Sequence, residues 1–145
     1  LAYLNRGASK NALKNHNDAI LDYNKVIEIN PNSDEAYNNR GISKCQLKDY
    51  NAAILDLNKA IEINPKLSTS YFNRALVKNV LKDDKGAISD YTKTIELNDK
   101  DANAYYKRGL SKLFLKEKNS GCLDLNKAME LGSKEAVEII KKYCN

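Results

Sequence analysis

The 145-residue sequence is poor in the residue types that carry most protein chemistry. It contains one histidine and no tryptophan, and its three cysteines lie at no spacing typical of a metal site. His16 falls in an expected turn between helices, and no serine or cysteine forms a nucleophile motif with it. No apolar run approaches the roughly 18 residues of a membrane span. We therefore predict no enzyme activity, no cofactor, no metal site and no membrane span.

The cysteines Cys45, Cys122 and Cys144 are odd in number. We interpret them as free thiols, buried or half-exposed, because unpaired cysteines persist in reducing compartments. This interpretation favours a cytoplasmic location. The sequence begins at Leu1 without an initiator methionine, so we expect a fragment of a longer chain, whose upstream targeting signal would lie outside this sequence.

A period of 34 residues runs through the chain. Each copy opens with a small residue and a tyrosine, and three positions after the tyrosine come an arginine and another small residue. A fixed period of this length predicts stacked supersecondary units, because no single unit can bury its apolar face alone. The copies read Ala2-Tyr3-Leu4-Asn5-Arg6-Gly7, Ala36-Tyr37-Asn38-Asn39-Arg40-Gly41, Ser70-Tyr71-Phe72-Asn73-Arg74-Ala75 and Ala104-Tyr105-Tyr106-Lys107-Arg108-Gly109.

Each copy carries two helical patterns, which are clearest in the second one. The first runs from Tyr37 to about Lys48 and the next from about Asn51 to Ile63. Pro65 then ends the second pattern, because proline cannot continue a helix. Small residues at matched positions of both patterns predict closely packed helix pairs. They are Gly7, Gly41, Ala75 and Gly109 in the first pattern, and Ala19, Ala53, Ala87 and Gly121 in the second.

This pattern resembles the tetratricopeptide repeat (TPR) family over essentially the whole chain. Tyr37, Gly41, Ala53, Ala60 and Pro65 match the family's positions in the second copy. The resemblance implies an all-α fold, a right-handed superhelical solenoid of antiparallel helix pairs. We expect a single domain over residues 1–145, with repeats at about 1–33, 34–67, 68–101 and 102–132 and a capping helix at 133–143. The departures are local: Asp99 and Ser133 replace the terminal proline, Thr94 replaces an alanine, and Lys10, Lys44, Lys78 and Lys112 stand where the family often has an aromatic residue.

An arginine and an aspartate recur 16 residues apart in every repeat. The first helix carries the arginine and the second helix carries the aspartate, so we predict ion pairs that fix the packing angle of the helices. Each pair is expected to contribute about 1 kcal/mol. The pairs are Arg6/Asp22, Arg40/Asp56, Arg74/Asp90 and Arg108/Asp124.

Basic residues with four-residue spacing form a stripe along the first helix of each repeat. The helical wheel places Arg40 and Lys44 with the packed face, so we expect the lysine stems to cover the core while their ammonium groups reach water. Polyanion binding is a less favoured interpretation, and a nucleic-acid partner is not expected. The stripes are Arg6-Lys10-Lys14, Arg40-Lys44-Lys48, Arg74-Lys78-Lys82 and Arg108-Lys112-Lys116.

The other face of the first helices varies between repeats and becomes apolar towards the C-terminus. In proteins that this chain resembles, this face lines a concave groove that holds a peptide. The resemblance implies peptide contacts from Asn5, Asn39, Asn73 and Lys107, since an amide both donates to and accepts from a peptide backbone. The alternative is that these asparagines only solvate the wall. Further expected contacts are Asn38, Phe72, Leu76, Tyr106 and Leu110, whereas Leu113 and Phe114 are expected to lie under the capping helix.

A protein-interaction scaffold is the function that this reading favours, with an extended or short helical peptide as the ligand. The alternative is self-association through the uncapped N-terminal end. A two-carboxylate clamp, which some TPR domains use, fits poorly because lysine cannot reproduce the bidentate fork of arginine. The clamp positions hold Asn38, Ile42, Asn73, Asn103 and Lys107.

Overall fold

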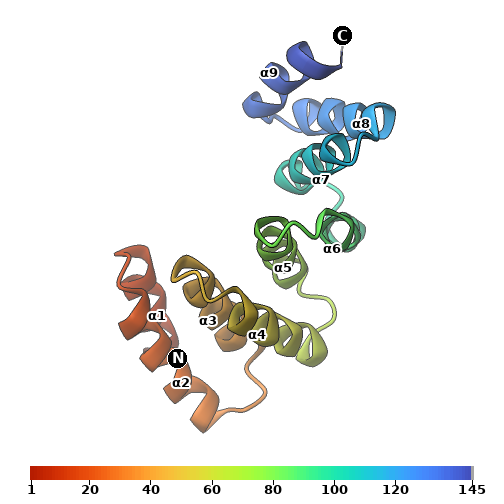
Figure 1. Cartoon of the computed structure of the whole chain (residues 1–145). Coiled ribbons are helices and arrows are strands. Elements are labelled where there is room, and N and C mark those ends of the chain that lie inside the picture. The colour runs from red at the N-terminus through yellow and green to blue at the C-terminus, as the bar shows by residue number, and fades with distance from the viewer. Residues whose placement is uncertain (145) are drawn as a thin grey trace. The chain divides into compact units, whose positions relative to one another are not determined.

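Nine α-helices make up the regular structure of residues 1–144, the part of the chain that a computed structural model describes (Figure 1). No β-strand occurs in these residues. The helices are α1 (Ala2–Ala12), α2 (His16–Ile29), α3 (Asp34–Gln46), α4 (Tyr50–Ile63), α5 (Ser68–Val80), α6 (Asp84–Leu97), α7 (Ala102–Phe114), α8 (Lys118–Glu130) and α9 (Lys134–Tyr143).

Short polar side chains fix where several of these helices begin. Ser33, Asp101 and Ser133 each accept a hydrogen bond from the backbone N–H three residues further on, at the starts of α3, α7 and α9. Asp49 and Asp83 do the same for α4 and α6. Each cap satisfies a backbone donor that the first helical turn leaves without a partner, so the chain enters each of these helices at a defined residue.

The turn inside each repeat contains a lysine with left-handed backbone geometry. The φ angles of Lys14, Lys48, Lys82 and Lys116 are 61°, 64°, 65° and 64°. A helix cannot continue through such a residue, so α3 ends at Gln46 and not at about Lys48, as the sequence analysis expected. Side chains with a Cβ adopt this geometry at a cost of about 1–2 kcal/mol, which glycine avoids.

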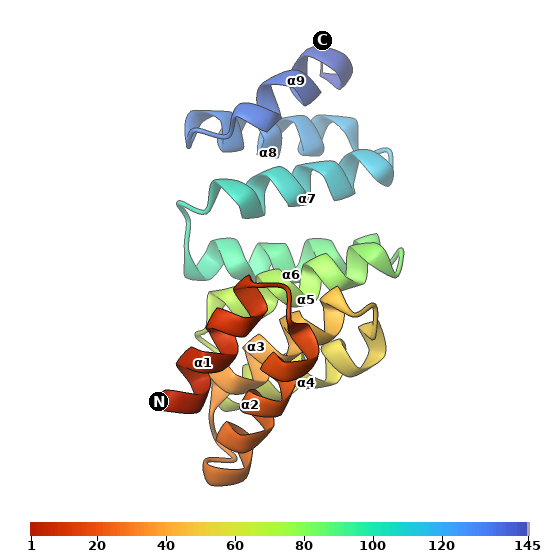
Figure 2. The same ribbon diagram turned by 90° about the vertical axis from the view of Figure 1, so that its left-hand side faces the viewer.

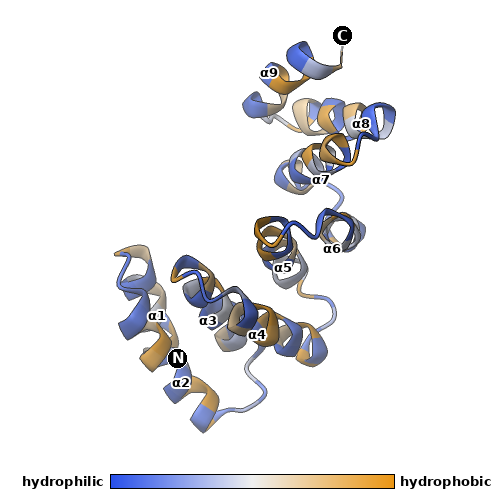
Figure 3. Cartoon of the chain, in the orientation of Figure 1, coloured by the Kyte–Doolittle hydropathy of each residue, from blue (hydrophilic) through white to orange (hydrophobic). Residues whose placement is uncertain are grey.

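The chain forms two compact units, Leu1–Val77 and Lys78–Asn145, and the boundary falls inside α5. Within each unit consecutive helices pack against each other as antiparallel pairs, among them α1 with α2, α3 with α4, and α7 with α8 (Figure 2). The helices carry hydrophobic and hydrophilic segments side by side, as amphipathic helices do (Figure 3).

In the first unit, small residues bring the helix pairs together. Ala19 and Ala36 are fully buried in one cluster with the side chains of Leu4 and Tyr23. Between α3 and α4, a Cβ added to Gly41 would lie 2.9 Å from Leu57. The close approach predicted from the small residues is therefore present in α1–α4.

In the second unit, two glycines face each other across α7 and α8. A Cβ on Gly109 would lie 3.0 Å from the backbone oxygen of Gly121, and a Cβ on Gly121 would lie 3.0 Å from that of Gly109. The two backbones are thus in direct contact, which side chains larger than glycine would prevent. Behind this contact, Leu125, Ala128 and Ala136 form a buried cluster that joins α8 to α9.

Two cysteines that the sequence analysis interpreted as free thiols form a disulfide, which corrects that interpretation. Cys122 of α8 is bonded to Cys144, which follows the last residue of α9, whereas Cys45 is a free thiol. An odd number of cysteines does not exclude one pair, and the packing of α9 on α8 brings these two within bonding reach. The expectation of a cytoplasmic location depended on free cysteines, so the disulfide removes its basis.

Candidate functional site

The recurring aspartate is nearly buried in each repeat, and in the first, second and fourth repeats it binds two cations. In the second repeat, Arg40 donates from Nε and Nη2 to the two oxygens of Asp56, at 2.8 and 2.6 Å. The Lys44 ammonium lies 2.7 Å from Oδ2 of the same carboxylate. Asp56 is 4% exposed. The ammonium group therefore binds the aspartate, which corrects the expectation that the lysine tips reach water.

The first and fourth repeats contain the same triad. Arg6 and Lys10 contact Asp22, with the Nε–Oδ2 and Nζ–Oδ2 distances both 2.9 Å. The hydrogen bond from Arg6 lowers the pKa of Asp22 from 3.8 to about 2, against the opposing effect of burial. The fourth triad is Arg108, Lys112 and Asp124, with distances of 2.7–2.8 Å.

In the third repeat, the Lys78 ammonium lies 2.8 Å from Oδ2 of Asp90. Arg74 and Asp90 belong to different compact units, and their pairing stays a prediction.

The same arginines also tie each repeat to the one before it. Nη1 of Arg40 donates to Asn24 at 2.6 Å, and Nη1 of Arg74 donates to Asn58 at 2.6 Å. Arg108 donates in the same way to Thr92 at 3.0 Å. Each arginine also lies over the ring of the tyrosine three residues earlier, at 5.1–5.7 Å from the ring centroid. These contacts were not predicted, although the constant 16-residue spacing from Asn24 to Arg40 is visible in the sequence.

Half of the recurring lysines are therefore engaged inside the fold. Lys10, Lys44, Lys78 and Lys112 bind aspartates. Lys14, Lys48, Lys82 and Lys116 lie in the turns after the first helices. The lysines thus do not form a continuous stripe along a helix, which weakens the interpretation as a polyanion site.

The asparagines of the second repeat form a hydrogen-bonded cluster with α5. Asn38 is 6% exposed, and its Oδ1 accepts hydrogen bonds from Ser70 at 3.1 Å and from Asn73 at 3.0 Å. Its Nδ2 donates to Asn39 at 3.1 Å. Three amides that the sequence analysis assigned to a ligand are thus joined to each other, whereas Asn5 on α1 is exposed.

Asn79, near the end of α5, holds together three elements of the second unit. Its Nδ2 donates to Asp84 at 2.7 Å and to Ser111 at 2.8 Å, and its Oδ1 accepts from the Tyr91 hydroxyl at 2.8 Å. Burial raises the pKa of Tyr91, so this hydroxyl stays protonated and remains a donor. Asn79 was not among the predicted site residues.

A hollow of about 350 Å³ lies beside Asn79, between the end of α5, the start of α6 and α7. Its apolar part comes from Leu110 and Phe114, and its charged part from Lys82, Lys107 and Asp84. Neither lysine forms an ion pair with any of the residues described. The hollow thus combines apolar side chains with two lysines outside any described ion pair and one carboxylate, Asp84, which accepts from Asn79.

The remaining predicted residues have different surroundings. Tyr106 packs against the Leu125–Ala128–Ala136 cluster and Lys107 lies over its ring, at 5.7 Å from the centroid. Leu113 packs on the same cluster, as expected. Phe114, by contrast, is 75% exposed, so the expectation that the capping helix covers it is wrong. Phe72 and Leu76 are partly buried on α5.

The single histidine and the potential metal ligands were also located among the described residues. His16 shares a hydrogen bond of 2.6 Å with Asn11. Residues 1–144 hold no group of three histidine, cysteine or acidic side chains that could bind a metal ion. Among the described helices, none is long and apolar enough to cross a membrane.

Comparison with known families decides what this arrangement of helix pairs is. Residues 1–33 and 34–67 each match the family model described as tetratricopeptide repeat. Residues 1–67 are two tetratricopeptide repeats, and the chain has the fold of solved TPR structures. The TPR fold expected from the sequence, an all-α superhelix of paired helices, is confirmed. A comparison with curated protein sequences gives no match.

Several solved structures share the fold of this chain. A crystal structure of MamA is 28% identical with a TM-score of 0.85, and the match covers 92% of this chain and 78% of MamA. The TPR domain of Arabidopsis OM64 is 26% identical with a TM-score of 0.74, covering 77% of this chain and 93% of the domain. The first TPR of Spaghetti (RPAP3), bound to the HSP90 peptide SRMEEVD, is 24% identical with a TM-score of 0.74, and the match covers 77% and 90% of the two chains.

Proposed function

We propose that this chain is an interaction module without enzyme activity, which binds an extended or short helical peptide on the varied face of its first helices. The observation that carries the proposal is the hollow beside α7. Leu110 and Phe114 offer apolar surface there, and Lys82 and Lys107 offer cations without ion-pair partners. Such a combination favours a segment with an apolar side chain close to a carboxylate.

The asparagines contribute differently in this proposal. Asn38 uses its amide within the fold, so it would position its neighbours and not contact the ligand. Asn39 and Asn73 are half-buried, and each amide keeps hydrogen-bonding groups beyond its bond with Asn38. We propose that, within residues 1–77, these two amides and the exposed Asn5 hold a peptide backbone, with apolar contacts from Phe72 and Leu76. Within residues 78–144, Tyr106 would add an apolar contact beside the hollow.

Peptide binding by a related fold supports the class of ligand. Spaghetti carries a bound peptide in its TPR, and that peptide is acidic. The fold alone does not transfer the ligand, because the sequences are only 24% identical. The cations at Lys82 and Lys107 are a feature of this chain and argue for an acidic segment independently.

A photo-crosslinking experiment tests the proposal in the cells that carry the gene. The crosslinking amino acid p-benzoylphenylalanine replaces Leu110 in one variant and Leu123, which is 72% exposed on α8, in the matched control. We expect protein adducts from position 110 and few or none from position 123. Adding Lys107→Glu to the first variant should reduce those adducts. Equal adducts from both positions would show that the face of α7 has no special role.

The alternative of self-association has one supporting observation. Leu1, Tyr3 and Leu13, at the two ends of α1, are 96%, 39% and 81% exposed. Sedimentation equilibrium over a hundredfold range of concentration tests it. A dimer that Leu13→Asp abolishes would support this alternative, and a monomer throughout the range would remove it.

A further inference from the structure

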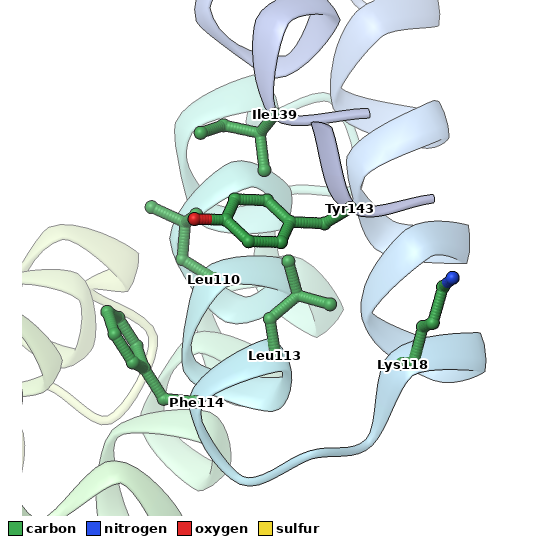
Figure 4. A pocket seen from close by; sticks show the side chains of 6 residues that line it. All are labelled: Leu110, Leu113, Phe114, Lys118, Ile139 and Tyr143. Carbon is green, nitrogen blue, oxygen red and sulfur yellow. The ribbon is translucent and has the colours of Figure 1, made fainter. Parts of the chain in front are cut away.

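A second hollow, of about 370 Å³, lies where the capping helix meets the last repeat. In the view of Figure 4 the Tyr143 ring lies between Ile139 and Leu113, while Phe114 and Lys118 lie on opposite sides of it. The volume of this hollow is in the range of pockets that enclose a small ligand or a large side chain. It is lined by Leu110, Leu113 and Phe114 of α7, Lys118 of α8, and Ile139 and Tyr143 of α9.

The chemistry of this hollow is apolar with a cation at one side. Five of its six lining residues are apolar or aromatic, and the sixth, Lys118, forms no ion pair with any residue described. The Lys142 ammonium lies over the Tyr143 ring, at 5.0 Å from its centroid. Of the acidic side chains next to these lining residues in the sequence, Glu138 pairs with Lys141, whereas Glu117, just before α8, accepts only from the Ser120 hydroxyl and does not line the hollow. The charged residue of the lining is thus a lysine, which favours a carboxylate on the occupant.

The wall of the hollow depends on how α9 is held. The start of α9 is fixed by its Ser133 cap and by the buried Ala136. Its end is tied by the disulfide from Cys144 to Cys122, directly after Tyr143. The last turn of a ten-residue helix frays when nothing anchors it. The disulfide thus holds the Tyr143 ring, which is itself 45% exposed, in its place.

We propose that this hollow is an anchor site for a bulky apolar side chain next to a carboxylate in a partner peptide, and that the site is complete only while Cys122 and Cys144 are bonded. This proposal specifies a class of ligand and a redox control for the peptide binding proposed above, and it rests on that proposed function. Leu110 and Phe114 line both hollows, so one segment can enter this site and continue along α7.

Reduction by a dithiol would open the wall. The dithiol gives two electrons and two protons to the Cys122–Cys144 bond and becomes a disulfide itself, while two thiols remain on the protein. The end of α9 is then free to fray and Tyr143 leaves the hollow. Leu110 and Phe114 stay on α7, so the neighbouring hollow beside Asn79 is unaffected.

Amide NMR titration of the full chain tests the proposal with defined probes. The probe is acetyl-Asp-Phe-Asp-amide, and the controls are acetyl-Asp-Ala-Asp-amide and acetyl-Lys-Phe-Lys-amide. With oxidised protein, we expect shifts at Leu113, Ile139 and Tyr143 from the probe, and at least fivefold weaker binding of both controls. Dithiothreitol should weaken binding of the probe at least fivefold, as should Tyr143→Ala, which leaves the disulfide intact. Cys45→Ser is the matched control and should bind like the wild type.

Each result has one meaning. Shifts that survive dithiothreitol unchanged overturn the dependence on the disulfide, provided that mass spectrometry shows the bond to be reduced. Lys118→Glu should reverse the preference towards the lysine-containing control, and no change in preference overturns the role of the cation. Shifts confined to Asn79, Lys82 and Lys107 overturn this site while leaving the proposed peptide binding intact. No shift anywhere with the probe overturns the site, and the crosslinking at position 110 then decides the proposed function separately.

Discussion

The varied face of the first helices differs between the two compact units. In residues 1–77 this face carries amides. Asn38 of α3 donates a hydrogen bond to Asn39 and accepts one from Asn73 of α5. In residues 78–144, α7 presents Leu110 and Phe114 beside two hollows with lysines that lack ion pairs. The same 34-residue repeat thus has a different surface chemistry in each unit. Where amides join neighbouring helices the face gains rigidity, and where apolar side chains stay uncovered it gains capacity to bind.

Removing the disulfide should produce the largest change, and it should be confined to the second unit. The bond closes a loop with a sequence separation of 22 residues, for which chain-entropy arguments give about 3 kcal/mol. We expect Cys122→Ser/Cys144→Ser to lower the free energy of unfolding of that unit by about this amount, measured by urea denaturation. Hydrogen exchange should accelerate in α9 and remain unchanged in α1–α4. Exchange that accelerates equally in α3 would contradict the separation of the two units.

The amide cluster of the first unit should respond to Asn38→Ala. The substitution leaves Ser70, which is fully buried, and Asn73 without their shared acceptor. We expect a loss of about 2 kcal/mol in the free energy of unfolding. The exposed Asn126 of α8 supplies the control, and Asn126→Ala should change stability by less than about 0.5 kcal/mol. If Asn38→Ala abolished probe binding in residues 78–144, the assignment of Asn38 to a structural role would be wrong.

The contrast between the units also shows what the sequence could predict. The 34-residue period and the small residues at Gly41, Ala53 and Gly109 predicted the paired helices, because each constraint recurs and lies close along the chain. The burial of Asn38 was missed, since that position carries Leu4 in the first repeat and Phe72 in the third. A single amide among apolar residues gives no sign of a hydrogen-bonded partner one repeat away.

The disulfide was missed for a related reason. Cys122 and Cys144 stand in no spacing that itself indicates a bond, and their meeting depends on where α9 packs on α8. The bonds from Lys44 and its equivalents to the aspartates were missed because the helical wheel gives the direction of a side chain but not its end point. The expected groove residues were chosen by position on the helix. The hollows depend on the shape that neighbouring helices leave open, as at Lys82 in the turn after α5.

Acid should weaken the first triad. The pKa of Asp22 is lowered from 3.8 to about 2, chiefly by the hydrogen bond from Arg6, so the carboxylate stabilises the fold above the unfolded value. That contribution is fully present above about pH 4 and is lost as the pH falls towards 2. We expect the urea midpoint of wild type to fall over this range and that of Asp22→Asn to fall less. Parallel curves for the two proteins would show that Asp22 does not carry the effect.

The smallest effect should come from the left-handed lysines. Lys48 and Lys82 have φ angles of 64° and 65°, and replacing either by glycine relieves the strain of this left-handed geometry. The gain in stability is reduced because glycine is more flexible in the unfolded chain. We expect each to raise the free energy of unfolding by about 0.5–1 kcal/mol, whereas Lys66→Gly, in a turn without left-handed geometry, should not.

The same two variants should differ in their affinity for an acidic peptide. Lys82 lines the hollow beside α7 and Lys48 lines no such site, so only Lys82→Gly should weaken an acidic peptide, by several-fold. Equal weakening by both would mean that the lysines act through net charge, and that the two units do not differ in recognition.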